Sequence, residues 1–409
     1  MRILHVTDNY LPFVGGLERA VHSLARQQVL DGHQVLVATA QVGDRPTAEE
    51  VDGVDVRRLP LALGRVPGAF VEGSRVFFPT VSDPLFARGF ARQLRLFRPD
   101  VINGHGWSTY SILGAARRAG VPVVNTAHDY GHVCALKTLQ RDGAACRGPQ
   151  PAACVRCAFG HYGPKGVPVA LGLQWSSRRH RDVDLWTGVS RAVTDVGSAP
   201  RVQDRAPMQV VPSYVSDGDL VEPPDEPRPA FVPEGDYLLY VGAIGRHKGV
   251  DVLLEAYGRL RANGTAPPLV LVGKPVDDLD LAAPGVVHQP GAPHQEVMAA
   301  WRHATAGVVP SRWAEPFGQV AVECLAAGTP AVVSAAGGLA LIVEDGVHGL
   351  HVRPGDAGAL AAALARLVSD PALRHRLGAA GPARAALFTV SAVAPTIEAL
   401  YRRVIGTDR

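Results

Sequence analysis

Two glutamates, Glu315 and Glu323, bound the segment EPFGQVAVE and are the first candidates for chemistry in this chain. Pro316 suits the first turn of a helix, because proline has no backbone N–H to lose. We therefore expect Glu315 in a loop and Glu323 about two turns into the helix that follows. Ionised carboxylates only accept hydrogen bonds, so the pair suits neighbouring hydroxyls such as those of sugars and riboses. The alternative is two solvated glutamates on a helix surface.

The start of that helix is a candidate anion site. It follows Ala306–Pro310, which has the apolar character of a buried strand. Unpaired backbone N–H groups at a helix N-terminus favour an anion such as a diphosphate. The amides predicted to point outward are those of Phe317, Gly318 and Gln319.

A second loop, in YVGAIGRHKGVDVLLEAY, places Lys248 between a strand that ends at Gly242 and a helix. A lysine beside a helix N-terminus can clamp phosphates and stabilise negative charge that develops on them. A solvated basic loop is the alternative for this feature taken alone.

Four of the five cysteines are clustered, with the spacing C-x11-C-x7-C-x2-C. In a cytosolic chain, clustered cysteines indicate metal ligands before disulfides, and one CxxC with two further cysteines can form a tetrahedral zinc site. Reduced thiols or disulfides and an iron–sulfur cluster remain as alternatives. The fifth, Cys324, is predicted to be a packed thiol. The clustered residues are Cys134, Cys146, Cys154 and Cys157.

The composition indicates a folded chain of two or three domains, since 409 residues contain 47% hydrophobic and 19% charged residues. The net charge of +3 does not require nucleic acid. Residues 1–217 nevertheless hold 25 Lys and Arg against 18 Asp and Glu, and residues 218–409 hold 16 against 20. The basic first part fits either a solvated face or attraction to an anionic acceptor or bilayer.

We expect a cytoplasmic protein, with peripheral contact at the inner face of a membrane as an alternative. The first residues, MRILHVTDNYLP, lack the charged and apolar regions of a signal peptide. The longest apolar stretch, around Ala357–Val368, contains Arg366 and is shorter than the roughly 20 residues that span a bilayer.

Short apolar runs alternate with amphipathic stretches, and the series occurs twice. This pattern predicts parallel sheets covered by helices, as two doubly wound α/β domains that face each other across a cleft. Ligands of such sheets bind at the carboxyl ends of the strands. The Pro-rich, acidic segment Val221–Pro233 is the candidate linker. The predicted domains are residues 1–217, with a cysteine-containing insertion at about 130–165, and residues 218–390.

These features together resemble the retaining glycosyltransferases of family 4, which have the two-domain GT-B fold. The E-x7-E pair matches Glu315 and Glu323, and the phosphate loop matches with Lys248 in the lysine position. The early loop LPFVGGLERAVHSLA resembles the Gly-Gly loop of the family, TAHD supplies a histidine, and VVPSYVSD resembles its linker segment. The closing residues 391–409, with Tyr401, resemble the helix that crosses back onto the first domain. The resemblance covers most of the chain.

The resemblance implies an enzyme of glycan biosynthesis that transfers a sugar from a nucleoside diphosphate sugar to a glycan, lipid-linked or secondary-metabolite acceptor. Glu323 would hold ribose hydroxyls, Glu315 sugar hydroxyls, and Lys248 the diphosphate. Gly16 would let its loop approach the ligands, and His128 would lie against the transferring sugar. His128, Glu315 and Lys248 would be the catalytic residues. No cofactor would be required. Apart from the resemblance, Asn103, His105 and Trp107 also follow a strand, so they are candidates for the acceptor side, with a purely structural role as the alternative.

One position departs from the family pattern. Ala243 stands where an arginine usually follows Val-Gly, so a phosphate contact is missing unless Arg246 replaces it. Three other classes of protein share parts of this pattern. A nicotinamide-dependent oxidoreductase would need GxGxxG after the first strand, where the chain has VGGLE. A non-catalytic binding protein of the same fold, and a phosphorylase or hydrolase on this scaffold, remain as alternatives.

Overall fold

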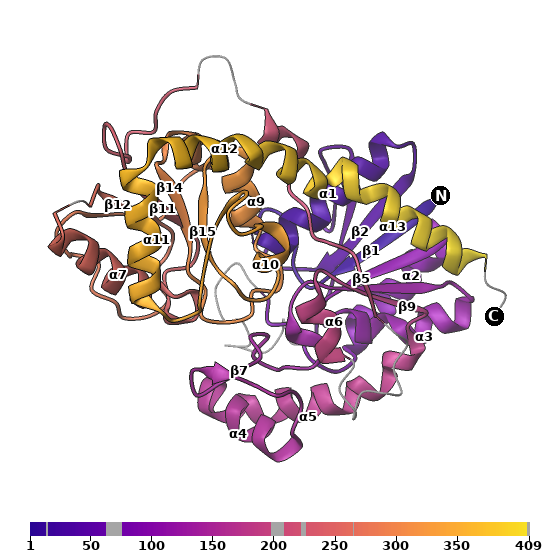
Figure 1. The fold of residues 1–409 in the computed structure, drawn as a ribbon. Coiled ribbons are helices and arrows are strands. Elements are labelled where there is room, and N and C mark those ends of the chain that lie inside the picture. The colour runs from indigo at the N-terminus through magenta and orange to yellow at the C-terminus, as the bar shows by residue number, and fades with distance from the viewer. Residues whose placement is uncertain (14, 63–75, 198–207, 222–225, 265, 407–409) are drawn as a thin grey trace. The chain divides into compact units, whose positions relative to one another are not determined.

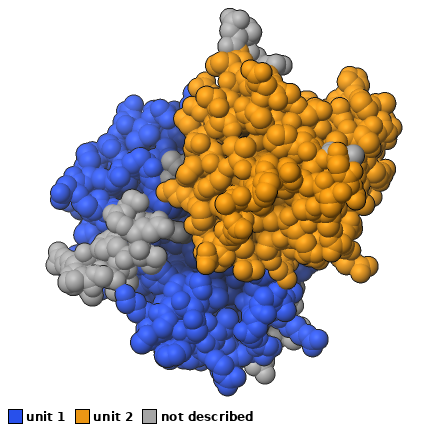
Figure 2. Space-filling view, turned by 90° about the vertical axis from the view of Figure 1, so that its left-hand side faces the viewer, with its two compact units in different colours: residues 1–213, 393–409 blue, residues 214–392 orange. Residues whose placement is uncertain are grey.

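The computed structural model describes residues 1–13, 15–62, 76–197, 208–221, 226–264 and 266–406. The chain forms two compact units (Figure 2): residues 1–213 with 393–409, and residues 214–392. Each unit has its own sheet and its own hydrophobic core. We describe each unit by itself.

The first unit contains an eight-stranded sheet in the order β10-β9-β6-β5-β1-β2-β4-β3 (Figure 1). All its neighbouring strands are parallel except β3 and β4. Strands with continuous apolar character are buried on both faces, as parallel sheets covered by helices require. The strands are β1 (Arg2–Thr7), β2 (Gln34–Ala40), β3 (Ala48–Val51), β4 (Val54–Leu59), β5 (Val101–His105), β6 (Val123–Ala127), β9 (Leu185–Gly188) and β10 (Met208–Val210).

Amphipathic helices cover this sheet, and α13 from the C-terminal end of the chain belongs to the same unit for most of its length. An insertion between β6 and β9 carries the clustered cysteines. It consists of a small hairpin and two helices that pack side by side below it in Figure 1. The helices are α1 (Gly16–Leu30), α2 (Pro84–Phe97), α3 (Thr109–Ala119), α6 (Arg191–Gly197) and α13 (Val390–Ile405); the insertion contains β7 (Gln140–Arg141), β8 (Ala144–Ala145), α4 (Pro151–Tyr162) and α5 (Gly166–Ser176).

The second unit contains a six-stranded, fully parallel sheet in the order β13-β12-β11-β14-β15-β16. This order reverses between β11 and β14, as in a Rossmann-like sheet. The strands are β11 (Leu238–Val241), β12 (Leu269–Val272), β13 (Val286–Gln289), β14 (Ala306–Val309), β15 (Ala331–Ser334) and β16 (Gly349–Val352). The helices are α7 (Val250–Ala262), α8 (His294–His303), α9 (Gln319–Ala326), α10 (Leu339–Ile342), α11 (Ala357–Ser369) and α12 (Pro371–Ala385).

The predicted fold class of two doubly wound α/β domains is confirmed, with three kinds of difference. Sequence patterns gave no strand for β3, β13 or β16, which lie at sheet edges. In β3 and β13 exposure breaks up the apolar run, whereas β16 is mostly buried but has Gly349 and His351 among its four residues. They also gave no helix for α4, α5, α6, α10 or α12. In α4, α5 and α12 the apolar residues do not gather on one side. Residues 222–225 of the predicted linker lie outside the described residues.

No helix in the described ranges combines the length and the apolar character needed to cross a bilayer.

Candidate active site

Lys248 and Glu315 form the central ion pair of the second unit. The Lys248 Nζ lies 2.7 Å from Glu315 Oε1 and 2.9 Å from Oε2. Lys248 follows β11 and Glu315 follows β14, so both loops leave the sheet at the point where the strand order reverses. Ligands bind at this point in open α/β sheets.

The Glu315 carboxylate accepts further hydrogen bonds. Ser311 Oγ and Trp313 Nε1 each donate to Oε2 at 2.9 Å. Burial alone would raise the pKa of the Glu315 carboxyl, but Lys248 and these donors outweigh it, so the pKa lies below its usual value. The Lys248 ammonium also lies 5.0 Å from the centre of the Trp313 ring. The site therefore holds one ionised carboxylate and one cation side by side.

The loop after Glu315 differs from the prediction. Helix α9 begins at Gln319, and Gly318 before it has φ +107°, so Pro316 is not in the first helical turn. Side chains rarely adopt this φ, which explains the glycine at position 318. No side chain caps the helix at Gly318. The Phe317 side chain packs edge-on against Phe388, with ring centres 5.7 Å apart, so only its backbone can face a ligand.

Glu323 lies about one turn into α9 rather than two, because the helix starts later than predicted. Its side chain is buried. Asp219 and His294 each present an atom within 4.8 Å of the Glu323 carboxylate. His294 Nε2 is 2.7 Å from Asp219 Oδ1. The amide of Gln319 donates from Nε2 to a backbone carbonyl, so its side chain is already engaged.

Arg246 lies two residues before Lys248 in the same loop, and its side chain is 61% exposed. Its Nη1 is 3.9 Å from Asp251 Oδ2, which Arg312 contacts more closely at 2.7 Å. Arg246 is thus held loosely and is able to turn toward a ligand. Its replacement of the arginine missing at Ala243 stays a prediction.

In the first unit, His128 ends a row of three histidines, of which His5 and His105 are buried and His128 is partly exposed. His5 Nδ1 is 3.1 Å from His105 Nε2, and His105 Nδ1 is 2.9 Å from His128 Nε2. His5 Nε2 is in turn 2.8 Å from the Gln28 Oε1. Burial lowers the pKa of His5 and of His128 to about 4 and that of His105 well below its usual value. The imidazoles are therefore neutral at pH 7.

His128 also lines a pocket of the first unit, together with Trp107 and Lys137. The Lys137 Nζ lies 4.4 Å from the centre of the Trp107 ring and 3.7 Å from Asp8 Oδ2. The expectation for Asn103 was wrong. Asn103 is fully buried and donates through Nδ2 to the Tyr401 hydroxyl at 2.6 Å. It therefore links β5 to α13 instead of facing a ligand.

Gly16 is the first residue of α1 and is exposed. Leu17 beside it lines the same pocket as His128. The Gly-Gly loop therefore lies close to the histidine that the sequence placed at the transferring sugar.

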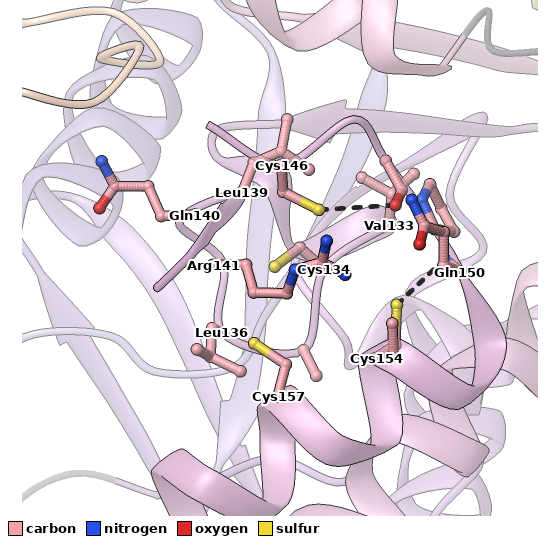
Figure 3. Close-up of a pocket in the computed structure, with 14 residues that line it drawn as sticks. Val133, Cys134, Leu136, Leu139, Gln140, Arg141, Cys146, Gln150, Cys154 and Cys157 are labelled. Atoms are coloured by element: carbon pink, nitrogen blue, oxygen red, sulfur yellow. Dashed lines mark hydrogen bonds between the residues drawn. The ribbon is translucent and has the colours of Figure 1, made fainter. Parts of the chain in front are cut away.

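The four clustered cysteines line one pocket of the insertion (Figure 3). Cys154 and Cys157 lie one turn apart on α4, Cys146 follows the β7–β8 hairpin, and Cys134 precedes it. All are free thiols. Burial raises the pKa of the Cys134 and Cys157 thiols, with neighbouring cysteines as a further cause.

No three of the four cysteine sulfur atoms lie within 4.8 Å of one another, as the ligands of a shared metal ion would. Among the described residues, the single group of three or more such ligand atoms within 4.8 Å of one another is that of Asp219, His294 and Glu323. Gln150 donates from its backbone N–H to Cys154 Sγ at 3.3 Å, and Cys146 Sγ is 3.5 Å from the Gly148 carbonyl oxygen.

Sequence reasoning missed four residues of these sites. Ser311 and Trp313 stand just before the glutamate motif, and their polar hydrogens near a predicted carboxylate were the available signal. His5 and Gln28 lie in the interior of a strand and of a helix, where a buried polar residue needs a partner. That need indicates a network but not its members.

Comparisons with known proteins agree with this architecture. The family described as "Glycosyltransferase Family 4" matches residues 14–216, and "Glycosyl transferases group 1" matches residues 223–384. A D-inositol 3-phosphate glycosyltransferase of Frankia alni is 32% identical over 417 residues, which cover 96% of this chain and 95% of that protein.

Solved structures share the fold at lower identity. Sucrose-phosphate synthase of Thermosynechococcus elongatus aligns with a TM-score of 0.74 and 22% identity over the full length of both chains. HepE of Anabaena, solved with UDP and glucose, aligns with a TM-score of 0.67 and 17% identity over 98% of this chain and 100% of its own. The two Rossmann-like units are those of the GT-B fold, and the chain belongs to the family-4 glycosyltransferases.

Proposed function

We propose that this glycosyltransferase moves a sugar from a nucleoside diphosphate sugar to an acceptor with retention of the anomeric configuration. The observation that carries the proposal is the Lys248–Glu315 ion pair, at 2.7 Å, at the reversal point of the second sheet. A paired cation and carboxylate offer donors to a diphosphate and acceptors to sugar hydroxyls in one place.

The donor roles follow from the chemistry of each group. Lys248 contacts the diphosphate, and the amides of Phe317, Gly318 and Gln319 at the start of α9 add donors to it. Glu315 binds hydroxyls of the donor sugar. Glu323, buried one turn into α9, binds the ribose hydroxyls. Arg246 adds a further phosphate contact.

The transfer itself needs no metal in this scheme. The glycosidic bond to the diphosphate breaks, and Lys248 and the helix amides stabilise the charge left on the phosphate oxygen. The acceptor oxygen attacks from the same face, and the departing phosphate takes its proton. His128 lies against the sugar, and Gly16 lets its loop approach the reactants. No carboxylate nucleophile is required.

The acceptor is proposed to be anionic, within the broader class of glycan, lipid-linked and secondary-metabolite acceptors. Two observations support this choice. The first 217 residues carry a net charge of +7, and Lys137 lines the pocket beside His128. The relative from Frankia alni is named for a phosphorylated acceptor.

We also propose peripheral contact with an anionic membrane through α4 and α5. Phe159, Leu171 and Trp175 are exposed there by 52%, 52% and 65%. Arg178 lies over the Trp175 ring at 5.1 Å, and Lys165 is exposed between the two helices. Aromatic and basic side chains together suit a bilayer interface. Binding of the full chain to sedimented phosphatidylglycerol vesicles, lost in Trp175→Ser, tests this contact.

For the cysteine cluster we propose structural zinc over paired thiols or an iron–sulfur cluster. All four thiols line one pocket, and Cys154 and Cys157 face it from one helical turn, as ligands from a CxxC do. The insertion also has few buried apolar side chains on α4, so a metal would stabilise it. Metal content of the purified protein tests this, with Cys157→Ser expected to lower it and Cys324→Ala to leave it unchanged.

The donor is tested first by thermal unfolding with nucleoside diphosphates and sugar nucleotides. A ligand at about 100 times its dissociation constant adds about 2.7 kcal/mol, which raises the Tm by a few degrees. One base should give a shift, larger with its sugar nucleotide. The product is then analysed by NMR, where the anomeric configuration of the donor should be kept. No shift with any nucleotide favours a non-catalytic binding protein, and cleavage that needs only phosphate or water favours a phosphorylase or hydrolase.

A further inference from the structure

Three neighbouring strands of the first sheet, β6, β5 and β1, bring three histidines into one hydrogen-bonded row. His5 lies in the interior of β1, His105 is the last residue of β5, and His128 directly follows β6. The strand order reverses beside β1 here, so the row runs from the sheet interior to the edge where ligands bind. From this row we infer that Gln28, His5 and His105 are positioning residues that fix which nitrogen of His128 carries the proton.

The direction of the row follows from its first member. The Gln28 Oε1 can only accept, so His5 Nε2, at 2.8 Å, carries a hydrogen and donates to it. In a neutral imidazole the other nitrogen then carries no hydrogen and has a lone pair that can accept a hydrogen bond. His5 Nδ1 therefore accepts from His105 Nε2 at 3.1 Å.

The same rule continues to the end of the row. His105 Nδ1 is left with a lone pair and accepts from His128 Nε2 at 2.9 Å. His128 is thus held with its proton on Nε2, pointing inward, and with the lone pair on Nδ1. A histidine that lines the pocket in this form accepts a hydrogen bond and does not donate one through Nδ1.

Burial keeps the row neutral, which the argument requires. His5 and His105 are at most 1% exposed. The carboxylate that acts on His128 is that of Asp129, which raises its pKa, but burial outweighs this effect. Other titratable groups at this pocket are Lys137, His132 and Tyr110. A proton added to Nδ1 of His5 or of His105 would give two facing N–H groups and break one hydrogen bond.

This inference rests on the proposed function for its meaning in catalysis. A neutral His128 Nδ1 selects a donor sugar that presents a hydroxyl to it, because a hydroxyl can donate to the lone pair. A sugar that lacks the hydroxyl leaves the nitrogen without a partner, and such a loss disfavours the analogue. Through this row, His5 on β1 controls a specificity contact that His128 makes after β6, two strands away.

The experiment uses the full chain with nitrogen-15 in its histidines, and His128→Ala assigns the signal. NMR of the ligand-free protein should show the His128 proton on Nε2 and no titration between pH 5.5 and 8. His5→Leu removes the acceptor of His105, so the His128 signal should shift toward a mixture of the two forms. His5→Asn keeps an acceptor near the position of Nδ1 and should restore the wild-type signal.

Kinetics give the second readout. His5→Leu should lower kcat about tenfold, the effect of one lost hydrogen bond, with little change in donor KM. As the pH is lowered, its activity should begin to fall at a higher pH than that of the wild type. His5→Asn should reverse both the change in kcat and the change in pH dependence. If wild-type His128 carries its proton on Nδ1, or if His5→Leu leaves the NMR signal unchanged, the inference is wrong. If the NMR result holds but no sugar nucleotide is turned over, the proposed function fails instead.

Discussion

Each unit has a polar cluster at the reversal point of its sheet, but the cluster of the second unit is ionised and that of the first unit is neutral. In the second unit Lys248 and Glu315 are both ionised, and the pKa of the Glu315 carboxyl is lowered although it is buried. In the first unit His5, His105 and His128 are neutral, and burial lowers their pKa values.

The difference shows what decides the charge of a buried group. Burial disfavours charge in both places, but only the second unit supplies an opposite charge at 2.7 Å and further donors to the carboxylate. The histidines have one another as partners, and two neighbouring imidazoles that were both positively charged would repel each other. One site is therefore suited to hold a charged diphosphate sugar, and the other to accept a hydrogen bond from a neutral hydroxyl.

The largest expected effect comes from breaking the ion pair. Lys248→Ala removes the cation proposed to contact the diphosphate and leaves Glu315 without its closest partner, so the pKa of the Glu315 carboxyl should rise. We expect kcat/KM for the donor to fall by about 10²–10³-fold, as when one preorganised donor is removed from a developing charge. Arg259→Ala is the matched control, because Arg259 is exposed and pairs on the surface with Glu255. Equal activity of both variants would contradict the role of Lys248.

The two glutamates should separate nucleotide binding from sugar binding. Glu323→Ala should weaken binding of the free nucleoside diphosphate by about tenfold, because a charged hydrogen-bond partner of the ribose is lost. Glu315→Gln should leave free nucleotide binding nearly unchanged and weaken the sugar nucleotide or its turnover. Calorimetric titration with both ligands measures the difference. Unchanged donor binding and turnover in both variants would show that the site is assigned wrongly.

Acid should destabilise the first unit through its histidines. An unfolded histidine has a pKa near 6.5, and His5 and His128 have pKa values of about 4 in the fold. Unfolding therefore takes up protons below pH 6.5, so the free energy of unfolding should be highest above that pH and fall as pH decreases toward 4. Urea unfolding at pH 7, 6 and 5 measures this slope.

The matched variants for that slope are His128→Asn and His375→Asn. The first removes a partly exposed histidine whose pKa is lowered in the fold, and it should flatten the fall in stability with acid. The second changes an exposed residue and should leave it as in the wild type. An identical slope in all three proteins would argue against a His128 that is neutral in the fold.

The smallest expected effect sharpens the account of Glu315. Trp313→Phe keeps the ring near Lys248 but removes the Nε1–H that donates to the carboxylate at 2.9 Å. We expect a loss of about 1 kcal/mol in stability and at most a tenfold fall in kcat/KM. A loss as large as that of Lys248→Ala would mean that Trp313, and not the lysine, holds the carboxylate in place.

Sequence patterns predicted the central strands well and the periphery poorly. Continuous apolar runs such as Leu238–Val241 and Ala331–Ser334 are buried on both faces, so their composition alone marks them as strands. The edge strand Val286–Gln289 is half exposed and mixes polar with apolar residues, so it gave no such signal. Helix α9 starts later than expected because Gly318 adopts a positive φ that the glutamate spacing does not reveal.

The two α/β units and the residue types of the donor side were predictable from the sequence, since the glutamate pair and the lysine loop follow strands that composition identifies. Which groups meet depends on the fold. Lys248 and Glu315 come together from loops that are 67 residues apart in the chain, and His5 and His105 from strands that bring together residues 100 positions apart. The physical reason is that hydrogen bonds depend on distances of about 3 Å, and those distances are set by strand order and register rather than by local patterns.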